Sequence, residues 1–262
     1  MNGFAPAHVP ILRALGEVWG PDRFIVIGAA AVGYHIGMTW RRTLDLDLSV
    51  AAGISGYAKD LEDLGWRQDD KVPQRWYAPA DLIIDVIPAE PSSVRAGSFA
   101  WPDGSRMSLL GFRLAFADAI PAEVGTAAHI RVASLRSIVV LKMAAYLDKP
   151  WERETDLADI VHVLQAFVGP EADERWSPAV VELDLDYEEV GPYLLGTQLA
   201  AVAAGSESAL IRRFLSSLED ETDGLATLRR MAHRAPAGLR DTDSLRSRVH
   251  ALGRGLGAGK QT

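Results

Sequence analysis

Residues 43–50 have the sequence TLDLDLSV, in which leucine alternates with a polar or acidic residue. This period of two predicts a β-strand with one buried face, because successive side chains of a strand point to opposite sides. The leucines then face the core, and Asp45 and Asp47 point the same way, with their Cα atoms about 6.5–7 Å apart. Two such carboxylates repel each other unless a cation lies between them, and oxygen ligands suit Mg²⁺ or Mn²⁺. A solvated acidic face on a strand is the alternative interpretation.

A third acid lies in a run of a different kind. Residues 82–87 (LIIDVI) are apolar except for Asp85, and this run predicts a central strand that is buried on both faces. An unpaired carboxylate is costly in such a place, so Asp85 requires a salt bridge, a metal ion or a catalytic role. An Asp-x-Asp strand beside a strand with a single Asp is the arrangement that two-metal phosphoryl chemistry needs.

A phosphate-binding turn is predicted upstream. Residues 24–28 (FIVIG) predict a buried strand, and the small residues of 29–38 predict a helix that follows it directly. The N-terminus of a helix presents N–H groups and the positive end of its dipole, both of which favour phosphate. A dinucleotide-binding GxGxxG fingerprint is incomplete here, because Ala30 occupies the place of its middle glycine.

In combination, these motifs resemble the nucleotidyltransferase superfamily, which has the DNA polymerase beta-like fold. In that superfamily a Gly-Ser or Gly-Gly turn precedes Asp-x-Asp or Asp-x-Glu, and a later strand supplies a third acid. The likeness rests on residues 27–50 (IGAAAVGYHIGMTWRRTLDLDLSV) and 83–87 (IIDVI). The closer resemblance is to the branch that contains the AbiEii and MenT toxins, whose pattern is matched by Gly28, Ala31, His35, Arg41, Thr43, Asp45, Asp47 and Leu48. A later part of that pattern corresponds to residues 141–164, with Lys142, Asp156 and Asp159.

The resemblance implies a role for each matching residue. Asp45, Asp47 and Asp85 would hold two Mg²⁺ or Mn²⁺ ions, with Asp85 completing the second site or acting as the base. The implied catalytic residues are these three acids and Lys142. The residues implied to bind the nucleotide are Gly28, Ala29, Arg41, Thr43, Lys142 and Asp156. Ala29 departs from the Gly or Ser of the family and has no hydroxyl to offer a phosphate, which leaves only backbone N–H groups there.

Lys142 is unusual even without the resemblance. Apolar residues recur at spacings of three and four in residues 135–147, and Lys142 falls in the middle of this stripe. A lysine on a buried helix face must extend to solvent, pair with a carboxylate or bind a ligand, and phosphate suits its point charge. Asp156 and Asp159 lie in the first turns of the next helix, where the helix dipole alone favours acids.

The two halves of the chain differ in their patterns of apolar residues, and this difference predicts an α+β fold. We expect a nucleotidyltransferase-like α/β domain with a mixed sheet over residues 1–125, a helical domain that completes the cleft over 126–250, and a disordered tail over 251–262. Weaker strands are expected at 75–78, 106–112 and 129–133, a loop at 89–105, and helices at 135–147, 156–168, 190–204 and 207–219.

A second Asp-x-Asp motif, Asp184 and Asp186, is interpreted differently. No glycine turn precedes it, other acids surround it, and a helical segment follows it. These features predict a solvated loop or a helix cap and no metal site.

Composition excludes several classes of protein. With 48% hydrophobic and 24% charged residues, the chain of 262 residues has the composition of an ordinary globular protein. The absence of cysteine excludes disulfides, thiolate catalysis and cysteine-ligated metal sites. We expect a cytoplasmic protein with no membrane partner, because no apolar run reaches the ~18 residues of a bilayer span and no export signal is apparent. The net charge of −8 argues against a surface that coats nucleic acid, although residues 229–262 hold eight bases against two acids.

The expected activity is therefore the metal-dependent transfer of NMP from an NTP to a hydroxyl acceptor, with release of pyrophosphate. The resemblance to the toxin branch implies that the acceptor is a tRNA 3′ end and that a cognate antitoxin exists. A small acceptor, such as an aminoglycoside-like antibiotic, is the enzymatic alternative. A non-catalytic nucleotide-binding module, which Ala29 favours, and a Rossmann-type dinucleotide enzyme, which leaves Asp85 and Lys142 unexplained, are the others.

Overall fold

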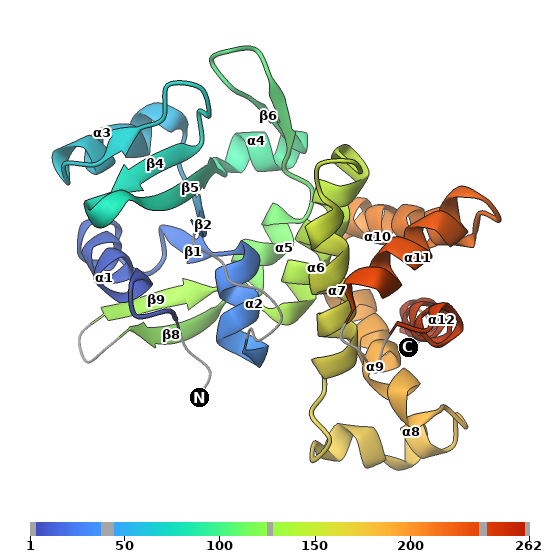
Figure 1. Ribbon diagram of the computed structural model, residues 1–262. Helices are drawn as coiled ribbons and strands as arrows, with labels where there is room; N and C mark the ends of the chain where they lie inside the picture. Colours follow the sequence, from blue (N-terminus) through green and yellow to red (C-terminus); the bar gives the residue numbers. More distant parts are fainter. Residues whose placement is uncertain (1–3, 38–44, 125–127, 236–239, 260–262) are drawn as a thin grey trace. The chain divides into compact units, whose positions relative to one another are not determined.

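The computed structural model describes residues 4–37, 45–124, 128–235 and 240–259, and the chain forms two compact units, Met1–Ile138 and Val139–Thr262 (Figure 1). The strands belong to the first unit, and the second is helical. The predicted α+β class, with a mixed sheet in the N-terminal part, is confirmed. The units divide inside a helix, later in the chain than the boundary between residues 125 and 126 that the sequence suggests.

A seven-stranded mixed sheet forms the frame of the first unit. Its strands lie in the order β3-β4-β5-β2-β1-β9-β8, and β6 and β7 form a separate two-stranded sheet. Strand β2 runs parallel to β5, and β1 runs parallel to β9, while the other neighbours are antiparallel. The strands are β1 (Phe24–Val26), β2 (Asp45–Val50), β3 (Arg67–Gln68), β4 (Arg75–Ala78), β5 (Leu82–Pro88), β6 (Ser98–Ala100), β7 (Arg106–Ser108), β8 (Ile120–Val124) and β9 (Ala128–Val132).

One face of this sheet is covered by helices through large aromatic side chains. Trp19 contacts Phe24 and Tyr57 edge to face, with ring centroids 5.5 and 6.5 Å apart, and Tyr57 contacts Trp76 at 6.4 Å. Phe24, Tyr57 and Trp76 are fully buried. Because strand side chains alternate, this packing leaves the acidic residues of β2 on the other face. The helices of the unit are α1 (His8–Trp19), α2 (Gly28–Ile36), α3 (Ile54–Asp63), α4 (Pro91–Ala96) and α5 (Phe112–Ala117), with a 3₁₀ turn, η1 (Pro79–Asp81).

The second unit is a group of helices in which small residues allow close packing. A Cβ atom at Gly196 of α9 would overlap the carbonyl of Leu252, and one at Gly255 of α12 would overlap the carbonyl of Tyr193. The backbones of α9 and α12 therefore approach each other closely at these glycines. The helices are α6 (Leu135–Asp148), which begins in the first unit, α7 (Glu154–Ala166), η2 (Asp173–Trp176), α8 (Pro178–Val181), α9 (Tyr187–Val202), α10 (Gly205–Glu219), α11 (Asp223–Arg234) and α12 (Thr242–Ala258).

Two expectations about loops are wrong. The segment 89–105 contains α4 and β6, because Pro91 begins a short helix that the proline-rich composition concealed. The expected disordered tail over 251–262 is helical as far as Ala258, and Ala251, Leu252 and Leu256 are buried. Among the described residues, no helix combines the length and the apolar character needed to cross a membrane.

We expect Gly255→Ala to lower the free energy of unfolding of the helical unit by about 1–3 kcal/mol, because the added methyl meets backbone atoms that cannot rotate away. Gly257→Ala is the matched control on the same helix. The space around Gly257 is open, so its replacement should stabilise slightly, by up to ~1 kcal/mol, through helix propensity. Urea unfolding followed by circular dichroism measures both, and equal effects would contradict the close approach of α9 and α12.

Candidate active site

The pairing of three strands places a row of charged residues across the sheet. Asp47 of β2 lies directly opposite Asp85 of β5, and Asp85 lies opposite Arg75 of β4. Paired residues of neighbouring strands point to the same face, so these three side chains share one side of the sheet. Asp45 joins them because it precedes Asp47 by two residues on the same strand.

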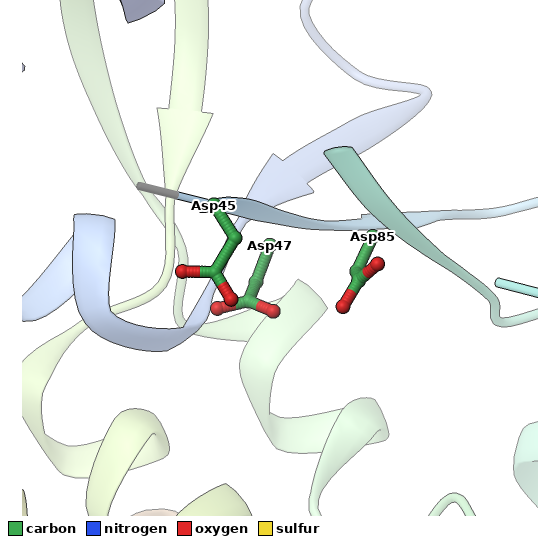
Figure 2. A group of neighbouring side chains, drawn as sticks. All are labelled: Asp45, Asp47 and Asp85. Atoms are coloured by element: carbon green, nitrogen blue, oxygen red, sulfur yellow. The ribbon is translucent and has the colours of Figure 1, made fainter. Parts of the chain in front are cut away.

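Asp45, Asp47 and Asp85 form one cluster, named here the acid trio. One carboxylate oxygen from each residue lies within 4.8 Å of the others. Figure 2 shows the three carboxylates turned to the same side of the two strands. The side chain of Asp85 is 13% exposed, and Asp45 and Asp47 are half-buried. Three converging carboxylates are a suitable oxygen ligand set for Mg²⁺ or Mn²⁺.

The apolar residues around the acid trio explain why it forms. Leu46 and Leu48 are fully buried on the opposite face of β2, as the alternation predicts. Ile84 and Val86 of β5 are also fully buried, and β5 has a strand on either side. Both strands are thereby held in place by apolar packing, and their acids have no alternative to the shared face.

Gly28 is required by the close approach of the backbone to Asp47. It has a φ of +64°, and a Cβ atom at this position would overlap the carboxylate of Asp47. The preceding residue, Ile27, donates its N–H to the carbonyl of Asp47 at 3.0 Å. Helix α2 begins at Gly28, so its N-terminal end lies beside the acid trio. Ala29 is only 4% exposed, so this position packs into the interior.

Arg75 is a site residue that the sequence analysis missed. Its guanidinium donates from Nε to Oδ1 of Asp85 and from Nη2 to Oδ2, both at 2.9 Å. This hydrogen-bonded pair raises the pKa of Arg75 above its usual value. Of the alternatives that the sequence leaves open for Asp85, the structure combines the salt bridge with a position inside the acid trio. In the sequence, Arg75 is one charged residue in a weakly predicted strand. No local sequence pattern specifies which strands pair, so its place beside Asp85 could not be predicted.

Lys142 lies in the helical unit, buried between two acids. Its Nζ is 2.8 Å from Asp156 and 2.7 Å from Asp159, and its side chain is 7% exposed. Burial disfavours the charged amine, but the two carboxylates outweigh it and raise the pKa of Lys142. Of the three possibilities for a lysine on a buried helix face, pairing with carboxylates is the one observed.

The remaining sequence predictions have mixed outcomes. Arg41 and Thr43 lie outside the described residues. The Nε2 atom of His35 lies 2.8 Å from the carbonyl oxygen of Ala133, and burial lowers the pKa of His35, which suits a packing residue. Asp186 forms a capping box with Glu189 at the start of α9, so the second Asp-x-Asp motif is a helix cap, as predicted.

No protein-family model and no curated protein matches this chain. Among solved structures it is similar to the antibiotic-resistance factor ANT(2'')-Ia, with a TM-score of 0.36 and 15% identity over 84% of this chain and 97% of that one. It is similar to an antigenic nucleotidyltransferase-like protein from Paracoccidioides brasiliensis, with a TM-score of 0.44 and 11% identity over 86% and 94%. The Thermotoga maritima CCA-adding enzyme, solved with tRNA, has a TM-score of 0.32 and 15% identity over 88% and 51%.

We expect Gly28→Ala to weaken Mn²⁺ binding at least tenfold, because the new methyl displaces the carboxylate of Asp47. The matched control is Gly65→Ala in the same unit, where φ is +77° and the space is open. Both variants bear the backbone strain of about 1–2 kcal/mol for a residue with a Cβ atom in this conformation. Calorimetric titration with Mn²⁺ separates them, and unchanged binding by Gly28→Ala would contradict the role given to this glycine.

Replacing Lys142 with Met is expected to destabilise the helical unit by about 3–5 kcal/mol, because two buried carboxylates lose their cation. Lys149→Met provides the control. Lys149 pairs with Glu152 on the surface, where an ion pair contributes at most ~1 kcal/mol. Urea unfolding measures both variants. If the two losses were equal, the buried cluster would not be a determinant of stability.

Proposed function

We propose that this protein is a metal-dependent nucleotidyltransferase that transfers NMP from an NTP to a hydroxyl acceptor. The convergence of Asp45, Asp47 and Asp85 on one face of the sheet, beside the glycine turn that begins α2, carries the proposal. Carboxylates on two adjacent strands next to a helix N-terminus provide both a cation site and a phosphate-binding element.

Each residue of the acid trio has a function in this chemistry. When bound, two Mg²⁺ ions would neutralise charge on the triphosphate and lower the pKa of the attacking hydroxyl. Asp45 and Asp47 would hold these ions, and Asp85 would complete the second site or accept the proton of the acceptor hydroxyl. The acceptor oxygen forms a bond to the α-phosphorus, the bond from that phosphorus to the bridging oxygen breaks, and pyrophosphate leaves.

The order of residues across the sheet gives the site a direction. The N-terminal end of α2 lies beside Asp47, and its N–H groups would bind the β- and γ-phosphates. Asp85 lies on the other side of Asp47, toward β4. The acceptor hydroxyl would therefore approach from the side of Asp85, opposite the leaving pyrophosphate, which suits an in-line displacement.

The remaining nucleotide contacts come from the resemblance. Arg41 and Thr43, which follow α2 in the sequence, would bind the triphosphate. Lys142 would contact a phosphate, and Asp156 would orient Lys142 or the nucleotide. Within the helical unit the lysine already pairs with Asp156 and Asp159, and its third N–H would be the donor to a phosphate oxygen.

The identity of the hydroxyl acceptor is a separate question within the proposal. The resemblance implies a tRNA 3′ end and a cognate antitoxin, but a tRNA needs a basic surface. Several bases of 229–254 are engaged within the helical unit: Arg234 pairs with Glu154, Arg246 pairs with Asp243, and Arg248 is only 4% exposed. The second candidate is a small hydroxyl compound of the aminoglycoside type, which the net charge of −8 favours over RNA. Incubation with α-labelled NTPs and either total tRNA or an aminoglycoside panel distinguishes the two.

Replacing any of Asp45, Asp47 or Asp85 with Asn is expected to lower the rate of NMP transfer by about 10²–10⁴, because each substitution removes a charge from the acid trio. Asp184→Asn is the matched control, since it changes an Asp-x-Asp motif on the surface of the helical unit. Release of pyrophosphate from each NTP is the measurement. NTP binding without pyrophosphate release would indicate a non-catalytic module, and neither binding nor release would contradict the proposal altogether.

A further inference from the structure

The guanidinium of Arg75 binds one member of the acid trio, and the proposed reaction assigns this arginine no role. It donates to both oxygens of Asp85, one from Nε and one from Nη2, in the bidentate geometry typical of arginine and carboxylate. Asp85 nevertheless keeps an oxygen within 4.8 Å of Asp45 and Asp47. The same carboxylate thus has a cation partner on one side and two like charges on the other.

The local structure holds Arg75 firmly against Asp85. Its N–H donates to the carbonyl of Val72, and its own carbonyl accepts from the N–H of Asp69. The next residue, Trp76, is fully buried on the opposite face of the sheet, which anchors β4. The side chain of Arg75 is only 30% exposed. The guanidinium is therefore preorganised beside the acid trio.

The position of Arg75 matters because of the negative charges of the acid trio. Three carboxylates so close together repel one another, and a single positive charge beside Asp85 relieves part of that repulsion. A divalent ion would relieve it as well, and its positive charge would lie close to the guanidinium at the same carboxylate. The two cations would repel each other across Asp85, so each would weaken the binding of the other to this carboxylate.

We propose that Arg75 is a built-in counter-ion of Asp85, which holds this carboxylate in the acid trio while no divalent ion is bound and competes with the ion for it. The inference rests on the proposed function in one respect, namely that the acid trio takes a divalent ion. It goes beyond it by assigning a positioning residue on β4 that sets the affinity of the site for metal. Its direction is distinctive, since the loss of a residue that merely supports the site would weaken metal binding.

The test titrates the full chain with Mn²⁺ alone, and the free ion is followed by electron paramagnetic resonance. R75M is expected to bind Mn²⁺ about threefold to tenfold more tightly than the wild type, because a competing positive charge has been removed. R67M is the matched control. Arg67 lies on the neighbouring strand β3 and stacks on Tyr77 at 4.4 Å, so its replacement should leave Mn²⁺ binding unchanged. Equal or weaker binding by R75M overturns the inference.

A thermal measurement separates competition from a purely structural role. R75M should melt at a lower temperature than the wild type without metal, because the acid trio has lost its arginine. Saturating Mn²⁺ should then raise its melting temperature by more than it raises that of the wild type. A loss of stability that is the same with and without Mn²⁺ would overturn the inference.

Arg75→Gln keeps the test usable if R75M does not fold. A glutamine removes the positive charge but keeps N–H donors for Asp85. Mn²⁺ binding about twofold to threefold tighter than that of the wild type is expected, and unchanged or weaker binding by this variant argues against competition.

Failure of the inference and failure of the proposed function give different results. If the wild type binds Mn²⁺, D45N does not, and R75M binds like the wild type, the metal site stands and the role of Arg75 falls. If the wild type binds no Mn²⁺ and R75M gains binding, the counter-ion role is supported while the proposed function fails. If neither protein binds Mn²⁺, both are overturned.

Discussion

The candidate site of the N-terminal unit is governed by one constraint: three carboxylates gathered at one point repel one another. Two unit charges about 4 Å apart repel each other by about 1 kcal/mol in water and about 4 kcal/mol near a protein surface. Asp45, Asp47 and Asp85 bear this cost because apolar packing on the opposite face of β2 and β5 fixes where their backbones lie. A cation at this point lowers the free energy of the folded chain. The guanidinium of Arg75 supplies one positive charge beside Asp85, and a divalent ion is the further cation proposed for the site.

The helical unit gathers acids in a different balance. Lys142 lies between Asp156 and Asp159, and all three are nearly inaccessible to solvent. Here the cation is central and buried, and it satisfies two carboxylates at once. Arg75, by contrast, lies at one end of the acid trio and donates to a single carboxylate. The two clusters thus differ in placement: the buried lysine pairs with both of its carboxylates, whereas the arginine pairs with one carboxylate of the candidate metal site.

Much of the candidate site could be predicted because its signals are local. The alternation of leucine with acid in residues 43–50 requires Asp45 and Asp47 to share a face, and the structure places them so. Gly28 could be singled out as a turn residue, since glycine adopts positive φ without strain. The helix in 89–105 and the ordered segment after residue 250 were missed, because glycine and proline in the sequence obscured elements that packing stabilises.

The sequence by itself determined which face of each strand carries its acids, because side-chain direction along a strand follows from a period of two. It also determined that Lys142 lies on a buried helix face, through the spacing of its apolar neighbours. Only the tertiary structure decided that β2 and β5 are neighbours in register, with Asp47 opposite Asp85, and that β4 brings Arg75 to the same carboxylate. Strand order and register arise from packing between segments distant in the chain, and no local pattern specifies such contacts.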